Sequence, residues 1–165
     1  MGIALLTLVL IGTAALVATT LMGYVGAHGA AWMRQHFLWS LGSTFLLVMG
    51  HSFVMFFLLA TGVEMKDLEK ARGWGDSFRK RTVAMKARVF PVMTSALLLV
   101  VINFMMGAAA HTRAVPRWLH EGLAWLTVAT CLLALYREYR ALGDNNRLIA
   151  EAASRREDTP AAGSR

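Results

Sequence analysis

The apolar residues of this chain fall into four long runs, separated by shorter polar or charged segments. The runs cover about residues 2–25, 37–62, 89–110 and 118–136. A helix rises about 1.5 Å per residue, so runs of this length can cross a bilayer hydrocarbon core of about 30 Å. We therefore predict an all-α membrane protein of four transmembrane helices. Short links favour antiparallel neighbours, so the helices are expected to form an up-down bundle.

The first run is interpreted as a retained membrane span. It is uncharged from Gly2 to Val25, and no basic residue precedes it. A cleavable secretory signal needs a positively charged start and a shorter apolar core. Neither requirement is met by this run.

Composition agrees with a single membrane domain. The chain has 165 residues, of which 56% are apolar, and its mean hydropathy is +0.49. We assign residues 1–153 to the transmembrane domain, including a charged loop at 63–88 in which a helix leaves the membrane and breaks near Gly73. Residues 154–165 are expected to form a disordered tail, because they are polar and rich in small residues. The lone cysteine, Cys131, excludes an intramolecular disulfide.

The basic residues are distributed unevenly between the two sides of the predicted bundle. Loop 63–88 carries eight Lys and Arg and the C-terminal segment six, whereas the links on the other side carry three. Lys and Arg gather in cytoplasmic loops, so both termini are predicted to be cytoplasmic, in a bacterial inner membrane. The net charge is +7, but its position beside apolar runs favours lipid headgroups as the partner and not a nucleic acid.

Four of the five histidines are thereby expected at the external face: His28, His36, His111 and His120. Because they come from two different links, they can converge only if the helices pack as a bundle. Two such histidines are suitable axial ligands for haem b, with aromatic residues nearby to pack on the macrocycle. The aromatic residues are Trp32, Phe37, Trp118 and Trp125.

This arrangement is similar in outline to membrane-anchored b-type cytochromes of four helices, in which histidines hold haem near one membrane face. The leading hypothesis is therefore an integral membrane redox protein. It would bind haem b near the external face and pass electrons to or from a quinone or a partner complex.

Three other interpretations stay open. The external histidines are also suited to the headgroup interface, where the ring is half in water. The same four, His28, His36, His111 and His120, are potential copper or zinc ligands, and several methionines in the runs suit Cu(I). Finally, the chain contains no phosphate-loop, dinucleotide, zinc-protease or serine-hydrolase motif, which favours a non-catalytic accessory or assembly subunit of a larger membrane complex.

The fifth histidine, His51, lies near the middle of the second run. An ionisable side chain at that depth normally faces the bundle interior and has a partner. Alignment of the runs places Thr13 and Cys131 near its depth, and no second histidine. We therefore expect His51 to bond a threonine or backbone carbonyl, to take part in proton transfer, or to bind a cofactor. A homodimer would supply a second His51, and the small residues Ser43 and Gly50 would allow close approach.

Several further polar residues have structural or supporting roles in this interpretation. His120 begins a polar stripe that continues at Thr127 and Cys131. Asn103 is expected to form an interhelical hydrogen bond. Glu121 would either orient a histidine or complement the positive end of its helix. The carboxylates of the charged loop are interspersed with basic residues and are expected to form a solvated face: Glu64, Asp67, Glu69 and Asp76.

Overall fold

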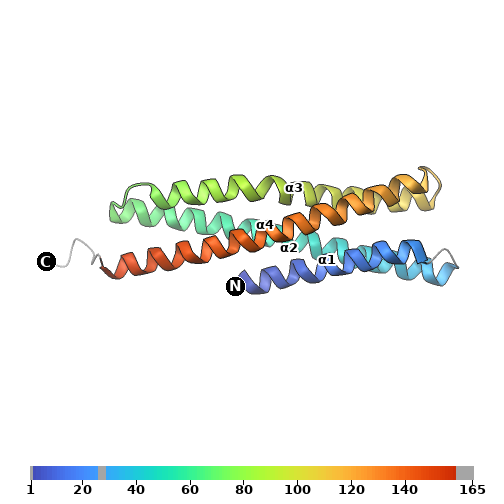
Figure 1. The fold of residues 1–165 in the computed structure, drawn as a ribbon, viewed down its shortest axis with the longest axis horizontal. Coiled ribbons are helices and arrows are strands. Elements are labelled where there is room, and N and C mark those ends of the chain that lie inside the picture. The colour runs from blue at the N-terminus through green and yellow to red at the C-terminus, as the bar shows by residue number, and fades with distance from the viewer. Residues whose placement is uncertain (1, 26–28, 159–165) are drawn as a thin grey trace.

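The computed structural model describes residues 2–25 and 29–158, and this part of the chain contains four helices and no strand. They are α1 (Gly2–Val25), α2 (Ala30–Arg72), α3 (Ser77–His111) and α4 (Arg117–Asp158). Successive helices run antiparallel and form one elongated bundle (Figure 1). Each helix is long and apolar enough to cross a membrane, as the sequence predicts.

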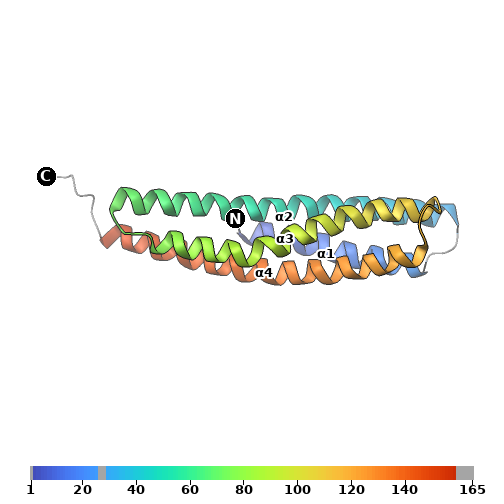
Figure 2. The same cartoon turned by 90° about the horizontal axis from the view of Figure 1, so that it is seen from above.

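The helices differ in length, and this divides the bundle into two parts. α1 has 24 residues, whereas α2, α3 and α4 have 43, 35 and 42. The N-terminus of α1 lies part-way along the bundle (Figure 2), where Gly2 packs beside Leu142 of α4. One part therefore contains four helices. The other contains three and is called the stalk below (residues 61–85 and 145–158).

Much of the stalk is built from residues that the sequence analysis placed in a loop or a tail. α2 continues to Arg72 and α3 starts at Ser77, so the predicted loop 63–88 consists mostly of helix around a short turn. Residues 154–158, expected to be disordered, form the last part of α4. The physical reason is a small apolar core that stabilises these helix ends by tertiary packing. Its residues are Met65, Phe78, Leu148 and Ala152.

Glu69 holds the turn of the stalk together. Its backbone oxygen accepts the N–H of Gly73, which ends α2 in the left-handed region with φ 65°. Its carboxylate accepts the backbone N–H groups of Phe78 at 2.6 Å and Arg79 at 3.2 Å, at the start of α3. Glu69 is only 4% exposed. The expectation that it belongs to a solvated face is therefore wrong, because capping α3 draws the carboxylate inward.

In the four-helix part, α1 and α2 pack closely through glycines. Gly50 of α2 lies against Val9 of α1, and Gly12 of α1 lies against Leu47 of α2. A Cβ atom at Gly50 would be 2.9 Å from Cγ2 of Val9, so only glycine permits this approach. Ser43 and Gly50 are both buried within the chain. They are therefore not on the outer surface, where the homodimer interpretation needed them.

Large apolar side chains cover much of the outer surface of the four-helix part. This surface is compatible with lipid acyl chains, which need no polar partner, and unsuited to water. Examples that are more than half exposed are Phe45, Phe56, Leu98, Met105 and Leu126.

Candidate functional site: a histidine pocket at one end of the bundle

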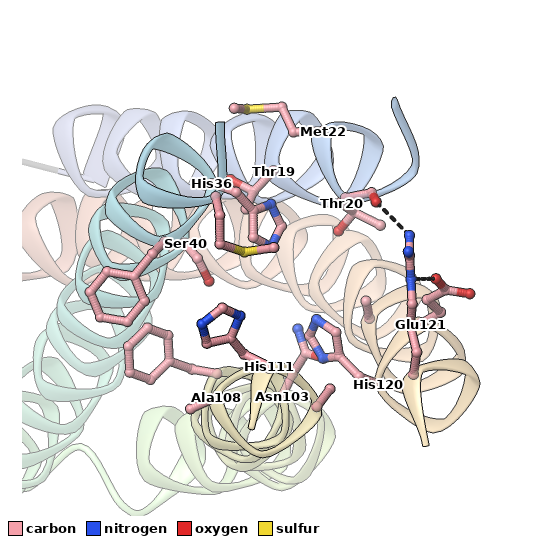
Figure 3. Close-up of a pocket in the computed structure, with 18 of the residues that line it drawn as sticks. Thr19, Thr20, Met22, His36, Ser40, Asn103, Ala108, His111, His120 and Glu121 are labelled. Carbon is pink, nitrogen blue, oxygen red and sulfur yellow. Dashed lines mark hydrogen bonds and ion pairs between the residues drawn. The ribbon is translucent and has the colours of Figure 1, made fainter. Parts of the chain in front are cut away.

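A pocket of about 550 Å³ lies between the helices at the end of the bundle opposite the stalk. Three of the histidines predicted to gather at this end line it, each from a different helix: His36 from α2, His111 from α3 and His120 from α4. Their rings face a common space (Figure 3). His28 lies outside the described residues. The cavity is called the histidine pocket below.

Two of the three rings lie against glycines of a neighbouring helix. A Cβ atom at Gly23 of α1 would be 3.4 Å from Cε1 of His36, and one at Gly107 of α3 would be 3.1 Å from Cε1 of His120. The Nδ1 atoms of His36 and His120 are buried and have no hydrogen-bond partner within the described part of the chain. Buried polar atoms in native proteins are nearly always paired, so these two nitrogens require an explanation.

Asn103 belongs to the same pocket and lies beside His120 in Figure 3. It is 8% exposed, and its Oδ1 also lacks a partner among the residues that the structure describes. The interhelical hydrogen bond expected for Asn103 is therefore not made through this oxygen. The unpaired amide oxygen therefore adds a third buried polar atom to the pocket.

Glu121 pairs with a cation and not with a histidine. Its Oε1 is 2.6 Å from Nε of Arg117, one turn earlier on α4. Nη2 of Arg117 donates a further hydrogen bond of 2.9 Å to the backbone oxygen of Gly23 at the end of α1. Arg117 therefore ties α1 to α4 at the pocket.

Aromatic side chains form apolar walls of the histidine pocket. The rings of Phe37 and Phe104 lie with their centroids 5.7 Å apart, so they join α2 to α3. Trp32 also lines the pocket and donates its Nε1 hydrogen to the backbone oxygen of Met22 at 3.2 Å. Trp118 and Trp125, which the sequence analysis also placed near a cofactor, are not among the lining residues.

The three histidines line the pocket without meeting at one point. Within residues 2–25 and 29–158, no group of three or more His, Cys, Asp or Glu is arranged to hold a metal ion. A tetrahedral zinc site needs three or four such ligands at about 2.0–2.3 Å. The described residues therefore offer no preformed site for a single metal ion. A larger ligand held between two imidazoles would not need three side chains to meet at one point.

A second polar site lies in the core between α2 and α4, away from the pocket. Nδ1 of His51 is 2.5 Å from Oε1 of Glu138, and both side chains are fully buried. The remaining ring nitrogen of His51 and the remaining oxygen of Glu138 have no partner in the described chain. The sequence analysis placed Thr13 and Cys131 near His51. It missed Glu138, because the fourth apolar run ends two residues earlier.

Comparison does not assign either site to a known group of proteins. The chain matches no family model, no curated protein and no solved structure with which it was compared.

Proposed function

We propose that the protein binds haem b in the histidine pocket and acts as an integral membrane redox protein. The observation that carries this proposal is that His36, His111 and His120, from three helices, line one pocket. A six-coordinate b-type haem can take two such imidazoles as its axial ligands.

The residues present suit such a group in size and polarity. The pocket volume of about 550 Å³ falls within the range of about 300–1,000 Å³ that is usual for cofactor and ligand sites. Phe37 and Phe104 supply flat apolar surface for a macrocycle. Arg34 lines the same pocket and supplies a cation for a propionate carboxylate, whereas Arg117 is already paired with Glu121.

The two histidines differ from ordinary buried residues in what their ring nitrogens can reach. Each of His36 and His120 has a buried Nδ1 without a partner in the described chain, although both rings adjoin a pocket large enough for a ligand. Because Nδ1 has no exposed surface in either ring, the nitrogen left for an occupant of the pocket is Nε2.

His36 and His120 are the residues that would hold the haem, since both rings are partly buried and lie against glycines of a second helix. Haem supplies one-electron chemistry when bound. The chain's own part is to fix the two rings, through Gly23 and Gly107, and to exclude water with the apolar walls. His111 is exposed and lies at the rim, so it is less suited to be an axial ligand.

The membrane orientation belongs to the same proposal. The stalk and its flanks carry most of the Lys and Arg, so we place the stalk and both termini in the cytoplasm of a bacterial cell. The histidine pocket then lies near the external face of the inner membrane. Its electron partner would be a quinone or a neighbouring membrane complex that reaches this face.

Optical spectra of the purified protein test the proposal. Protein expressed with adequate haem and purified in detergent is expected to show sharp reduced bands of a six-coordinate b-type haem after dithionite addition. His36→Ala and His120→Ala should remove these bands while the protein stays in the membrane fraction. Gln35→Ala is the matched control, because Gln35 is exposed next to His36 and does not line the pocket.

Two results would contradict this function. One is full haem retention by both histidine variants. The other is a featureless visible spectrum of wild-type protein despite available haem, which would favour the accessory-subunit interpretation.

A further inference from the structure

Three arginines surround a cleft at the junction of the four-helix part and the stalk. Arg88 comes from α3, and Arg137 and Arg140 come from α4. The cleft has a volume of about 300 Å³ and is called the arginine cleft below. Its other lining residues are Met85, Val89, Tyr136, Ala141 and Asp144.

The arginine cleft lies at the level where the apolar part of the bundle ends. Arg88 directly precedes the apolar run 89–110, and Arg137 directly follows the run 118–136. α3 and α4 are antiparallel neighbours, and both run ends line the same cleft, so they lie side by side. Phospholipid headgroups lie at this level of a membrane-spanning bundle. Tyr136, which is 54% exposed, fits the aromatic belt of such an interface.

The guanidinium groups of the cleft are left largely available for an anion. No ion pair between them and a carboxylate is found in the described part of the chain. Arg140 donates one hydrogen bond to the Tyr136 hydroxyl at 3.1 Å, and Arg88 donates one to the backbone oxygen of Ala84 at 3.2 Å. Each guanidinium has five N–H donors, so most of them remain for a ligand.

The local charge is positive, because three arginines face a single acid, Asp144, among the lining residues. Arg81 of the stalk, by contrast, pairs with Glu151 at 2.6 Å. The cleft therefore combines unneutralised, forked donors with a site between two helices, which is how basic pockets recognise lipid phosphates.

Apolar surface continues from the cleft toward the middle of the bundle. The floor is closed by buried residues, with Met85 4%, Val89 2% and Ala141 5% exposed. Leu133 lies one turn from Arg137 on the same face of α4 and is 45% exposed. A ligand with its phosphate among the arginines can thus lay an acyl chain along Leu133. Free phosphate would use the cations alone.

We propose that the arginine cleft binds the phosphate of an anionic phospholipid, with its acyl chains along the apolar part of the bundle. This binding site is separate from the histidine pocket and does not depend on haem.

Thermal unfolding of the purified protein in a zwitterionic detergent tests the site. Adding phosphatidylglycerol to the micelles should raise the Tm of the wild-type protein by about 4 °C or more, because a ligand of the folded state stabilises it. Phosphatidylcholine and inorganic phosphate should give no comparable rise. Arg137→Gln/Arg140→Gln should lose the shift, and native mass spectrometry should show fewer retained phosphatidylglycerol molecules on this variant than on wild type.

A charge-matched control separates the cleft from general surface charge. Lys66→Gln/Lys70→Gln removes two positive charges from α2 of the stalk, outside the cleft, and should keep the full shift. The proposed site would be overturned if both double variants lost the Tm shift equally. It would also be overturned if Arg137→Gln/Arg140→Gln kept the full Tm shift. A full shift with inorganic phosphate alone would overturn the lipid as its ligand. If the double arginine variant does not fold, Arg88→Gln on α3 replaces it, with the same expected loss.

Discussion

His51 of α2 and Glu138 of α4 form a buried pair across the bundle core, with Nδ1 and Oε1 2.5 Å apart and both side chains fully inaccessible. Moving charged groups out of water costs several kcal/mol per ion, and their mutual attraction offsets this cost only when the geometry is good. Each partner also keeps one buried polar atom that has no partner in the described chain. The stability of the core should therefore depend on both residues together.

Breaking this pair from one side should cost more than removing it completely. We expect His51→Leu or Glu138→Leu alone to lower the free energy of unfolding by about 3–5 kcal/mol, because a lone ionisable group stays buried. The double variant should recover most of this loss. Unfolding of the four proteins in detergent gives the coupling energy as a double-mutant cycle. Losses that simply add in the double variant would show that the two residues are not coupled.

The glycine contact between α1 and α2 gives a second prediction. Gly50→Ala would place Cβ 2.9 Å from Cγ2 of Val9 and 3.4 Å from its backbone. We expect a loss of about 1–3 kcal/mol in the free energy of unfolding, because the two helices must move apart. Gly42→Ala is the matched control on the same helix, where nothing lies within 4 Å. It should be neutral or gain up to about 1 kcal/mol from helix propensity. Equal behaviour of the two variants would contradict this packing.

Hydropathy was sufficient to locate the four helices, because each apolar run is long enough to identify a span without knowledge of its neighbours. Hydropathy did not locate the ends of the helices. α2 and α4 continue well past the charged residues that end the runs, since the stalk has its own apolar core around Phe78 and Leu148. That core depends on contacts between segments distant in sequence, which a local pattern does not contain.

Glu138 illustrates the same limit at the level of a site. The stripe that begins at His120 and continues at Thr127 and Cys131 reaches Glu138 after about five helical turns. Following it beyond the apolar run would have found the partner of His51. The histidine pocket could be predicted from the sequence only in part. The links place His36, His111 and His120 at one end, but their common cavity depends on the packing of the helices around it.

Glu69 should stabilise the stalk through the start of α3. Asp76 occupies the N-cap position but makes no side-chain capping bond there, whereas Glu69 accepts the N–H groups of Phe78 and Arg79. We expect Glu69→Ala to lower the free energy of unfolding by about 2 kcal/mol, because buried donors lose a charged acceptor. Glu64→Ala removes an exposed carboxylate from the same helix and should change it by less than about 0.5 kcal/mol. Hydrogen exchange of the Phe78 and Arg79 amides should accelerate only in the Glu69 variant.

The contact between Gly107 and His120 gives a prediction about the pocket that does not remove a histidine. Gly107→Ala would place Cβ 3.1 Å from Cε1 and 3.4 Å from Nε2 of His120, so the ring must shift within the pocket. If His120 holds haem, a strain of about 1.4 kcal/mol or more should weaken haem binding at least about tenfold. Gly122→Ala on α4, where nothing lies within 4 Å, should bind haem as wild type does. Titration of haem into the apoprotein, followed by absorbance, measures the haem affinity of both variants. Wild-type affinity in the Gly107 variant would show that the position of His120 is not used for haem.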